Sequence, residues 1–527
     1  MEHNLEKKTR KLLTTPNCLN ALIVNLIMFS FFILFFMLRQ SNFVFIHLLN
    51  ILSFIFLLIL PGFSFISFLF PNSKVINLEA KLILSITFSI AILELTGLIL
   101  NFTIGVGIYT LFFSIYFIIF VMSLITSLKF KKRLTESKKI IEMSSFVYLA
   151  YLVFFSLPLL TIISIYRVVN DYTYRHLAFF EANKKMDFLN PFIETGGYKF
   201  DFVDLYPGYD LILRYLGIFS ELPTETIQIL PIPGIAITLT LYLLLTKLTT
   251  NRLLAIILSI SAVPLDMAFS LQFNSVHYYS INALYYLAFL YFLISYLETK
   301  NDRKYFIILL SVLYISSLFI HHRAPIWMIL TLFGLIGISW IIDRNRHKLV
   351  FLALSFLILY LAFNKVAFNQ YLPKAVEYGL SFGFDTLNYS IYKIVGLKET
   401  TQNYMYPPSP AFIYSDEYNT INSIKHLSFM ILTSWAFLFK IKKIFKSGKE
   451  MSINDTIFLT LFSCLIAESI TYFMIGRVSM LYFTLVSAIF LAVIISDILE
   501  KLKNMGVDYG QGYYLGKPSF DIEKYLT

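Results

Sequence analysis

The chain alternates long apolar runs with short polar connections, and this pattern recurs along most of its length. A helix that crosses the hydrocarbon core of a bilayer needs roughly 20 apolar residues. Runs of about that length lie at 19–38, 43–70, 80–101, 108–128, 146–166, 227–246, 252–270, 281–297, 304–320, 324–342, 348–363, 426–438, 455–474 and 480–499. The pattern predicts an all-α polytopic membrane protein with about 14 transmembrane helices.

Two polar stretches, 167–226 and 364–425, are too long to be simple connections between spans. Within the first, residues 173–188 and 209–217 place apolar side chains at helical spacing, which predicts two short interfacial helices. The same stretch collects carboxylates, which a bilayer-embedded chain has little other reason to gather: Asp171, Glu181, Asp187, Asp201, Asp204 and Asp210. We therefore expect the chemistry of the protein in this stretch.

Composition narrows the class further. With 57% hydrophobic and 14% charged residues, and a mean hydropathy of +0.71, the chain is too apolar for a soluble protein. Its two cysteines, Cys18 and Cys464, are far apart and indicate neither a disulfide framework nor a metal site. The net charge of +11 is spread over short clusters between apolar runs, which argues against a nucleic-acid-binding domain.

The basic clusters instead predict topology. If the N-terminus is cytoplasmic, alternate loops carry most of the Lys and Arg residues, as the positive-inside rule requires. This orientation places the loops 167–226 and 364–425 on the extracytoplasmic face of a multi-pass cell-membrane protein. The first apolar run has no small-residue cleavage site, so we expect a retained helix.

A basic loop divides the chain into regions. We expect an N-terminal four-helix membrane region at 1–128, a basic cytoplasmic loop at 129–145, a transmembrane core at 146–499 and a cytoplasmic tail at 500–527. In the first region, Pro61-Gly62 can kink a helix or end it early. Glu94 lies inside the third run, either as a functional carboxylate or as a protonated group hydrogen-bonded between helices.

Two segments of the first long loop carry a family resemblance. NDYTYRH at 170–176 and DLYPGYDLILRYLG at 204–217 resemble the first external loop of the C-type membrane glycosyltransferases, which include the protein O-mannosyltransferases and the lipid A aminoarabinose transferases. The resemblance covers 167–217 well and the helices from 146 to 499 loosely, and it implies a core with the GT-C fold. Tyr172 stands where a second acidic residue is common, and Pro207-Gly208 replaces the family's double proline.

The resemblance implies roles for four residues in this loop. Asp171 matches the acidic residue that acts as general base or positions the acceptor, and a carboxylate at the membrane surface can take the proton of an acceptor hydroxyl. Asp171 could instead cap a helix that begins near Thr173. His176, Asp204 and Tyr206 are candidates for substrate binding, with a surface position or a turn-capping role as the alternative.

Three more sites lie at predicted outer helix ends. His277 precedes one helix, the segment His321-His322-Arg323 occupies a short turn between two helices, with His322 and Arg323 as the candidates, and Arg477 lies in the last outer turn. Arginine can hold an anionic phosphate through charge-assisted bidentate hydrogen bonds. Arg477 resembles the arginine that related families carry near the start of a late helix. The alternative for both arginines is snorkelling to lipid headgroups.

These observations predict a glycosyltransferase that moves a sugar from a polyprenyl- or dolichyl-phosphate-linked donor. The acceptor would be a glycan, a protein or a lipid on the extracytoplasmic face, with membrane lipids and no nucleic acid as further partners. The inner loops are too short for a nucleotide-sugar domain. No cofactor and no metal ligand is assigned, and a divalent cation is left open. A lipid-oligosaccharide flippase or transporter is the alternative, as is a polymerase or ligase of similar architecture. We find no convincing internal repeat, and the carboxylates gather at the outer surface rather than mid-bilayer, which favours the transferase.

Overall fold

The computed structural model describes most of the chain between residues 46 and 368. The described segments are 46–70, 76–130, 150–158, 194–195, 198–199, 207–220, 230–249, 251–262, 278–299, 302–342, 347–368 and 455–462, with a few shorter pieces. The elements are α3 (Ile46–Leu69), α4 (Leu78–Phe102), α5 (Ile108–Phe130), β1 (Glu194–Thr195), β2 (Tyr198–Lys199), α8 (Pro207–Ser220), α10 (Ile232–Leu248), α11 (Arg252–Ala262), α13 (Tyr278–Glu298), α14 (Arg303–Ile320), α15 (Arg323–Ile342) and α16 (His347–Phe368). Apart from the two-residue antiparallel pair β1–β2, the described elements are helices, so the all-α prediction is confirmed.

Five helices among the described residues are long and apolar enough to cross a membrane. They are Leu78–Phe102, Tyr109–Thr126, Tyr278–Glu298, Arg303–Ile320 and Leu349–Val366. The prediction of a membrane protein is therefore confirmed. The total of about 14 spans stays a prediction, because several of the apolar runs lie wholly or partly outside the described residues.

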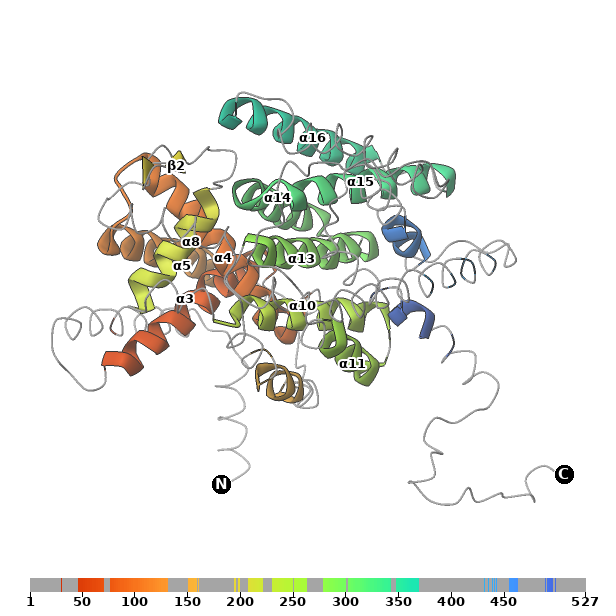
Figure 1. Cartoon of the computed structure of the whole chain (residues 1–527), viewed down its shortest axis with the longest axis horizontal. Helices are drawn as coiled ribbons and strands as arrows, with labels where there is room; N and C mark the ends of the chain where they lie inside the picture. The colour runs from red at the N-terminus through yellow and green to blue at the C-terminus, as the bar shows by residue number, and fades with distance from the viewer. Residues whose placement is uncertain are drawn as a thin grey trace, which may run out of the picture.

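The helix α13 lies at the centre of the described fold, between α10 and α14 (Figure 1). Nearly all of its residues are buried, which is expected of a helix that is apolar on every side. Its tyrosines bury their rings and find polar partners inside: Tyr286, for example, has its hydroxyl 3.0 Å from the hydroxyl of Thr331 on α15. Because α4, α10, α14 and α15 all pack against α13, one hydrophobic core joins them.

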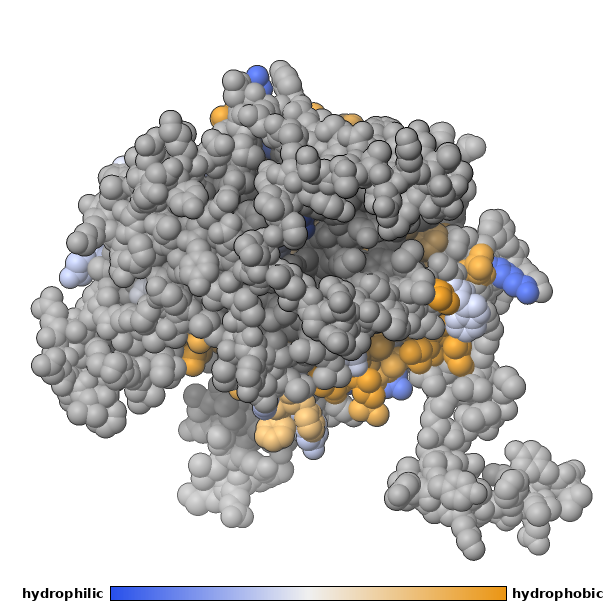
Figure 2. Space-filling model, in the orientation of Figure 1, coloured by the Kyte–Doolittle hydropathy of each residue, from blue (hydrophilic) through white to orange (hydrophobic). Residues whose placement is uncertain are grey.

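Peripheral helices expose apolar side chains on their outer faces. The α5 helix exposes Phe113 and Phe117, and α16 exposes Phe351 and Ile358. Figure 2 shows apolar side chains gathered where α11 lies, and this helix exposes Leu253. Exposed apolar faces of this kind suit lipid rather than water.

The helix ends form two groups that we name by their residues. At the lysine end, Lys247 on α10 pairs with Glu298 on α13 at 2.7 Å, and Lys81 on α4 donates a hydrogen bond to the carbonyl of Phe70. At the histidine end, His321 in the α14–α15 turn stacks on Tyr278 at the start of α13. The helices thus alternate in direction as the basic loops predicted, although the orientation in the cell stays a prediction.

One prediction about the N-terminal region, the kink or early helix end at Pro61-Gly62, has an outcome. α3 continues as a helix through Pro61 to Leu69, so the helix does not end early there. The amide of Gly62 instead donates to the Ser89 hydroxyl of α4 at 2.9 Å, which provides that amide with a partner outside its own helix. The boundary at residue 128 stays a prediction, and α4 packs against helices from both sides of it.

Candidate functional site

The residues predicted for the site fall into two groups. The structure describes His322 and Arg323, both at the histidine end. The remaining six candidates lie outside the described residues: Asp171, His176, Asp204, Tyr206, His277 and Arg477. The described chain resumes at Pro207, directly after the predicted Asp204–Tyr206 turn, and at Tyr278, directly after His277, so the neighbours of these candidates can be placed.

The predicted helix at 209–217 exists as α8, but its position differs from the prediction. Every residue from Gly208 to Leu216 is buried, whereas an interfacial helix exposes a polar face to water. The reason is that α8 packs against α3, α4 and α14 and so has protein around it. Its charged residues Asp210 and Arg214 are buried as well. The helix is part of the bundle rather than a surface element.

Aromatic and imidazole rings form a cluster at the histidine end. The ring of His321 stacks on Tyr278 at 4.8 Å between centroids, and Tyr209 of α8 meets Tyr278 edge-on at 6.0 Å. The guanidinium of Arg323 lies over the Tyr279 ring at 4.6 Å, within the range of a cation–π interaction. The start of α8 is therefore joined to the α14–α15 turn through Tyr278.

Hydrogen bonds fix the backbone of the same turn. The side-chain amide of Asn282 on α13 donates a hydrogen bond to the backbone carbonyl of His321 at 3.2 Å. The backbone N–H of Arg323 points at Nδ1 of His321, 3.4 Å away, which assigns the accepting role to that nitrogen. The sequence does not show which ring of the triplet His321–Arg323 stacks on α13, so it could not single out His321.

His322 is a weaker anion ligand than its residue type suggests. Burial, and secondly the charge of the adjacent Arg323, lower the pKa of His322 from 6.5 to about 3. At pH 7 its imidazole is neutral and can donate one N–H without carrying a positive charge. Arg323 is thus the positively charged side chain of this turn at pH 7.

Glu94 is the deep carboxyl group of this region. It is fully buried on α4 and accepts a hydrogen bond from the Tyr285 hydroxyl of α13 at 2.7 Å. Its other oxygen, Oε1, has no hydrogen-bond partner among the described residues. That oxygen lies against Gly208, the second residue of α8. The structure therefore places Glu94 beside the Pro207-Gly208 turn of the motif that carries the family resemblance.

The described residues form no metal-binding centre. Among the residues that the structure describes, no three His, Cys, Asp or Glu side chains lie together as they would around a metal ion. The divalent cation left open from the sequence is therefore given no ligands by this part of the chain.

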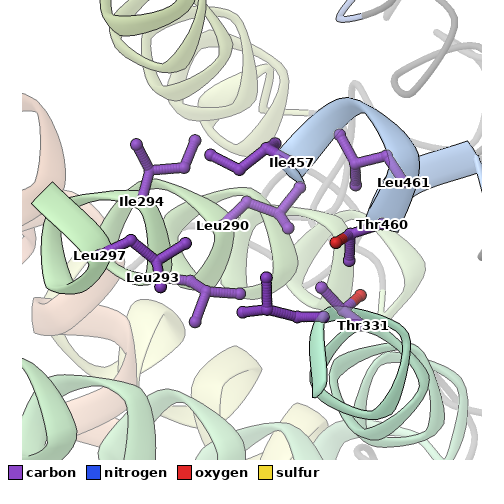
Figure 3. A pocket seen from close by; sticks show the side chains of 9 residues that line it. Leu290, Leu293, Ile294, Leu297, Thr331, Ile457, Thr460 and Leu461 are labelled. Atoms are coloured by element: carbon purple, nitrogen blue, oxygen red, sulfur yellow. The ribbon is translucent and has the colours of Figure 1, made fainter. Parts of the chain in front are cut away.

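A small cavity lies between α13, α15 and the segment 455–462 (Figure 3). It measures about 10 Å³, which is room for at most one water molecule. Its lining is apolar except for two threonines. Thr331 donates to the Trp327 carbonyl and Thr460 to the Thr456 carbonyl, so neither offers a free hydroxyl proton. As lined by the described residues, this cavity has no room for a substrate.

Comparison with known proteins gives one partial match. A family model described as a domain of unknown function (DUF8471) matches residues 26–147. This segment contains α3, α4 and α5, and thus Glu94. No curated protein and no solved structure matches the chain.

Proposed function

We propose that this protein is a membrane glycosyltransferase that moves a sugar from a polyprenyl- or dolichyl-phosphate donor to an acceptor on the extracytoplasmic face. One observation carries the proposal: the start of α8 at Pro207-Gly208 packs against the end of α14, directly before the His321–Arg323 turn. Gly208 lies against both Glu94 and the Phe319 carbonyl, two residues before His321. The motif that resembles the transferases and the predicted phosphate-binding turn thus meet at one end of the bundle.

Each partner of the reaction would have a place at this end. The Arg323 guanidinium would bind the donor phosphate, since it is the charged group of the turn and is held over the Tyr279 ring. His322, being neutral, would donate one hydrogen bond to a phosphate or sugar oxygen. Asp171, by its resemblance to the family's acidic residue, would take the proton of the acceptor hydroxyl as that oxygen attacks the sugar. The sugar–phosphate bond would then break, leaving the lipid phosphate on Arg323.

A lipid-oligosaccharide flippase is the second candidate, and the burial of Glu94 favours it. Ionisable residues inside a membrane bundle frequently mark transport pathways or proton relays. Glu94 is fully buried among α4, α8 and α13, and Oε1 has no partner among the described residues. The gathering of most carboxylates at the predicted outer surface favours the transferase, whereas the burial of Glu94 strengthens the rival. A polymerase or ligase would use the same outer face and differ only in its acceptor.

An arginine pair provides the test of donor binding. Arg323 and Arg303 each begin a helix and each lie over a tyrosine ring, but Arg303 is at the lysine end, over Tyr296 at 5.2 Å. Losing a charge-assisted hydrogen bond costs about 1.5–3 kcal/mol, which is about 10- to 100-fold in affinity. We expect Arg323→Ala to raise the KM for a labelled polyprenyl-phosphate sugar by about 10- to 100-fold, and Arg303→Ala to leave it within about twofold.

Equal KM values for both variants would remove Arg323 from the donor site and leave snorkelling as its role. The flippase predicts another result. Proteoliposomes that contain the wild-type protein would move labelled lipid-linked oligosaccharide between leaflets without forming any glycosylated acceptor.

A further inference from the structure

The helices α4 and α8 contact each other through two reciprocal pairs of a polar side chain and a glycine. The Glu94 carboxyl of α4 lies where a Cβ on Gly208 of α8 would be, and that Cβ would also come within 2.9 Å of the Phe319 carbonyl. In return, the Tyr215 hydroxyl of α8 lies where a Cβ on Gly97 of α4 would be. Each helix therefore accepts a side chain of the other in the space that its glycine leaves open. We call these four residues the α4–α8 interlock.

The polar atoms of the interlock make it different from ordinary packing. Glu94 and Tyr215 are both fully buried. Neither Glu94 Oε1 nor the Tyr215 hydroxyl has a hydrogen-bond partner among the described residues. Leaving such atoms unpaired costs free energy, and an apolar side chain of similar size would avoid that cost. Polar side chains at this contact are therefore better explained by a role in the site than by stability.

The position of the interlock indicates that role. Gly208 is the second residue of α8, and in the sequence it follows closely on Asp204 and Tyr206, two of the predicted substrate-binding residues. The partner Glu94 is itself held by Tyr285 of α13, seven residues after the Tyr278 that stacks on His321. A chain of contacts thus runs from α4 to both halves of the proposed site.

We infer that Glu94 is a positioning residue, which holds the Pro207-Gly208 turn in register with the His321–Arg323 turn so that both can bind the lipid-linked donor. The inference rests on the proposed function, and it gives α4 a part in the reaction. Glu94 acts through α8 and touches no substrate. Its size and its hydrogen bond to Tyr285 matter, and the amide of glutamine can supply both.

A double-mutant cycle tests the contact without using activity. We expect Gly208→Ala to lower the Tm of the purified protein by several degrees, and to lower it clearly less when Glu94→Ala has made room for the new methyl group. The matched control is Gly337→Ala on α15, because a Cβ there meets nothing within 4 Å. Its effect on Tm should be the same with and without Glu94→Ala.

Kinetics test the positioning role. Displacement of the two turns would weaken the charge-assisted hydrogen bond to the donor phosphate, so we expect Glu94→Ala to raise the KM for the labelled polyprenyl-phosphate donor by at least about tenfold with a smaller change in kcat. Glu94→Gln should keep a KM close to wild type because it keeps the shape and the acceptor for Tyr285. If Gly208→Ala does not fold, Tyr215→Phe is the second variant that tests the α4–α8 interlock. It removes only the Tyr215 hydroxyl, which lies against Gly97.

The outcomes separate the inference from the proposed function. Additive Tm changes in the Glu94/Gly208 cycle would overturn the interlock. Coupled Tm changes with an unchanged donor KM in an active Glu94→Ala protein would overturn the positioning role. Coupled changes together with no transfer by the wild-type protein would retain the contact and overturn the proposed function on which the role rests.

Discussion

At the scale of single residues, the hydrogen bond between Tyr285 and Glu94 is the contact whose loss should lower the stability of the fold most. In Tyr285→Phe, the buried carboxyl loses the one donor that the described residues give it. We expect a decrease of about 1–3 kcal/mol in the free energy of unfolding, measured by denaturant titration in detergent. Tyr286→Phe is the control, because Thr331 keeps its bond to the Trp327 carbonyl, and its cost should stay below about 1.5 kcal/mol. Equal costs would mean that Glu94 has no special dependence on Tyr285.

The lowered pKa of His322 gives a prediction for pH. The unfolded chain binds a proton at His322 below about 6.5, whereas the folded chain does so only near pH 3. The stabilising contribution is therefore complete above pH 6.5 and is lost as the pH falls toward 3. We expect the Tm of the wild-type protein to decrease over this range more steeply than that of His322→Gln. Parallel curves would show that the folded protein lets His322 titrate normally.

At this scale the sequence could single out Glu94, with a hydrogen bond between helices as one of its two expected roles, but it could not reveal the partner Tyr285. Glu94 and Tyr285 are 191 residues apart, and neither belongs to a motif. Periodicity marks which face of a helix is apolar, but it does not say which distant residue a buried carboxyl will meet. The position of His322 and Arg323 between two helices could be predicted, because only a short basic and polar segment separates two apolar runs there. Their role in binding stays a prediction.

At the scale of elements, the contact between α3 and α4 depends on Gly62. A Cβ there would overlap the Ser85 carbonyl and come within 2.6 Å of the Ser89 amide nitrogen, both on the backbone of α4. Backbone atoms cannot move aside without moving the helix, so Gly62→Ala should destabilise the protein by about 1–3 kcal/mol. Gly337→Ala has open space around its Cβ and should be neutral or stabilising by up to about 1 kcal/mol. Thermal unfolding of both variants checks this; an unchanged Tm in Gly62→Ala would contradict the close α3–α4 contact.

Most described helices could be predicted from the sequence to within a few residues. The predicted run 80–101 corresponds to the observed helix Leu78–Phe102, and the run 304–320 corresponds to Arg303–Ile320. Their length is set by the thickness of the bilayer, which is a strong physical constraint. The environment of α8 could not be predicted, because the same amphipathic pattern suits a membrane surface and a groove in the bundle. Only the neighbours α3, α4 and α14 decide between them.

At the scale of the whole molecule, the orientation in the membrane decides whether the proposed site faces outward. After replacement of Cys18 and Cys464, we expect a cysteine at Gly197 to react with an impermeant thiol reagent added outside cells. A cysteine at Thr135 should react only after permeabilisation. The reason is the distribution of Lys and Arg between alternate loops. The reverse labelling pattern would place the histidine end in the cytoplasm.

The most direct test of the account is sugar transfer by the purified wild-type protein and by Asp171→Asn. The amide keeps the shape of the side chain and is as good a helix cap as aspartate, but it cannot accept the proton of the acceptor hydroxyl. The measurement is transfer of labelled sugar from a panel of polyprenyl-phosphate donors, with donor binding and Tm recorded for both proteins. The account predicts transfer by the wild-type protein, and a folded Asp171→Asn protein that binds donor and transfers at least about 100-fold more slowly. Near-normal turnover in Asp171→Asn would contradict the catalytic assignment, and no transfer by the wild-type protein with any donor would contradict the proposed function.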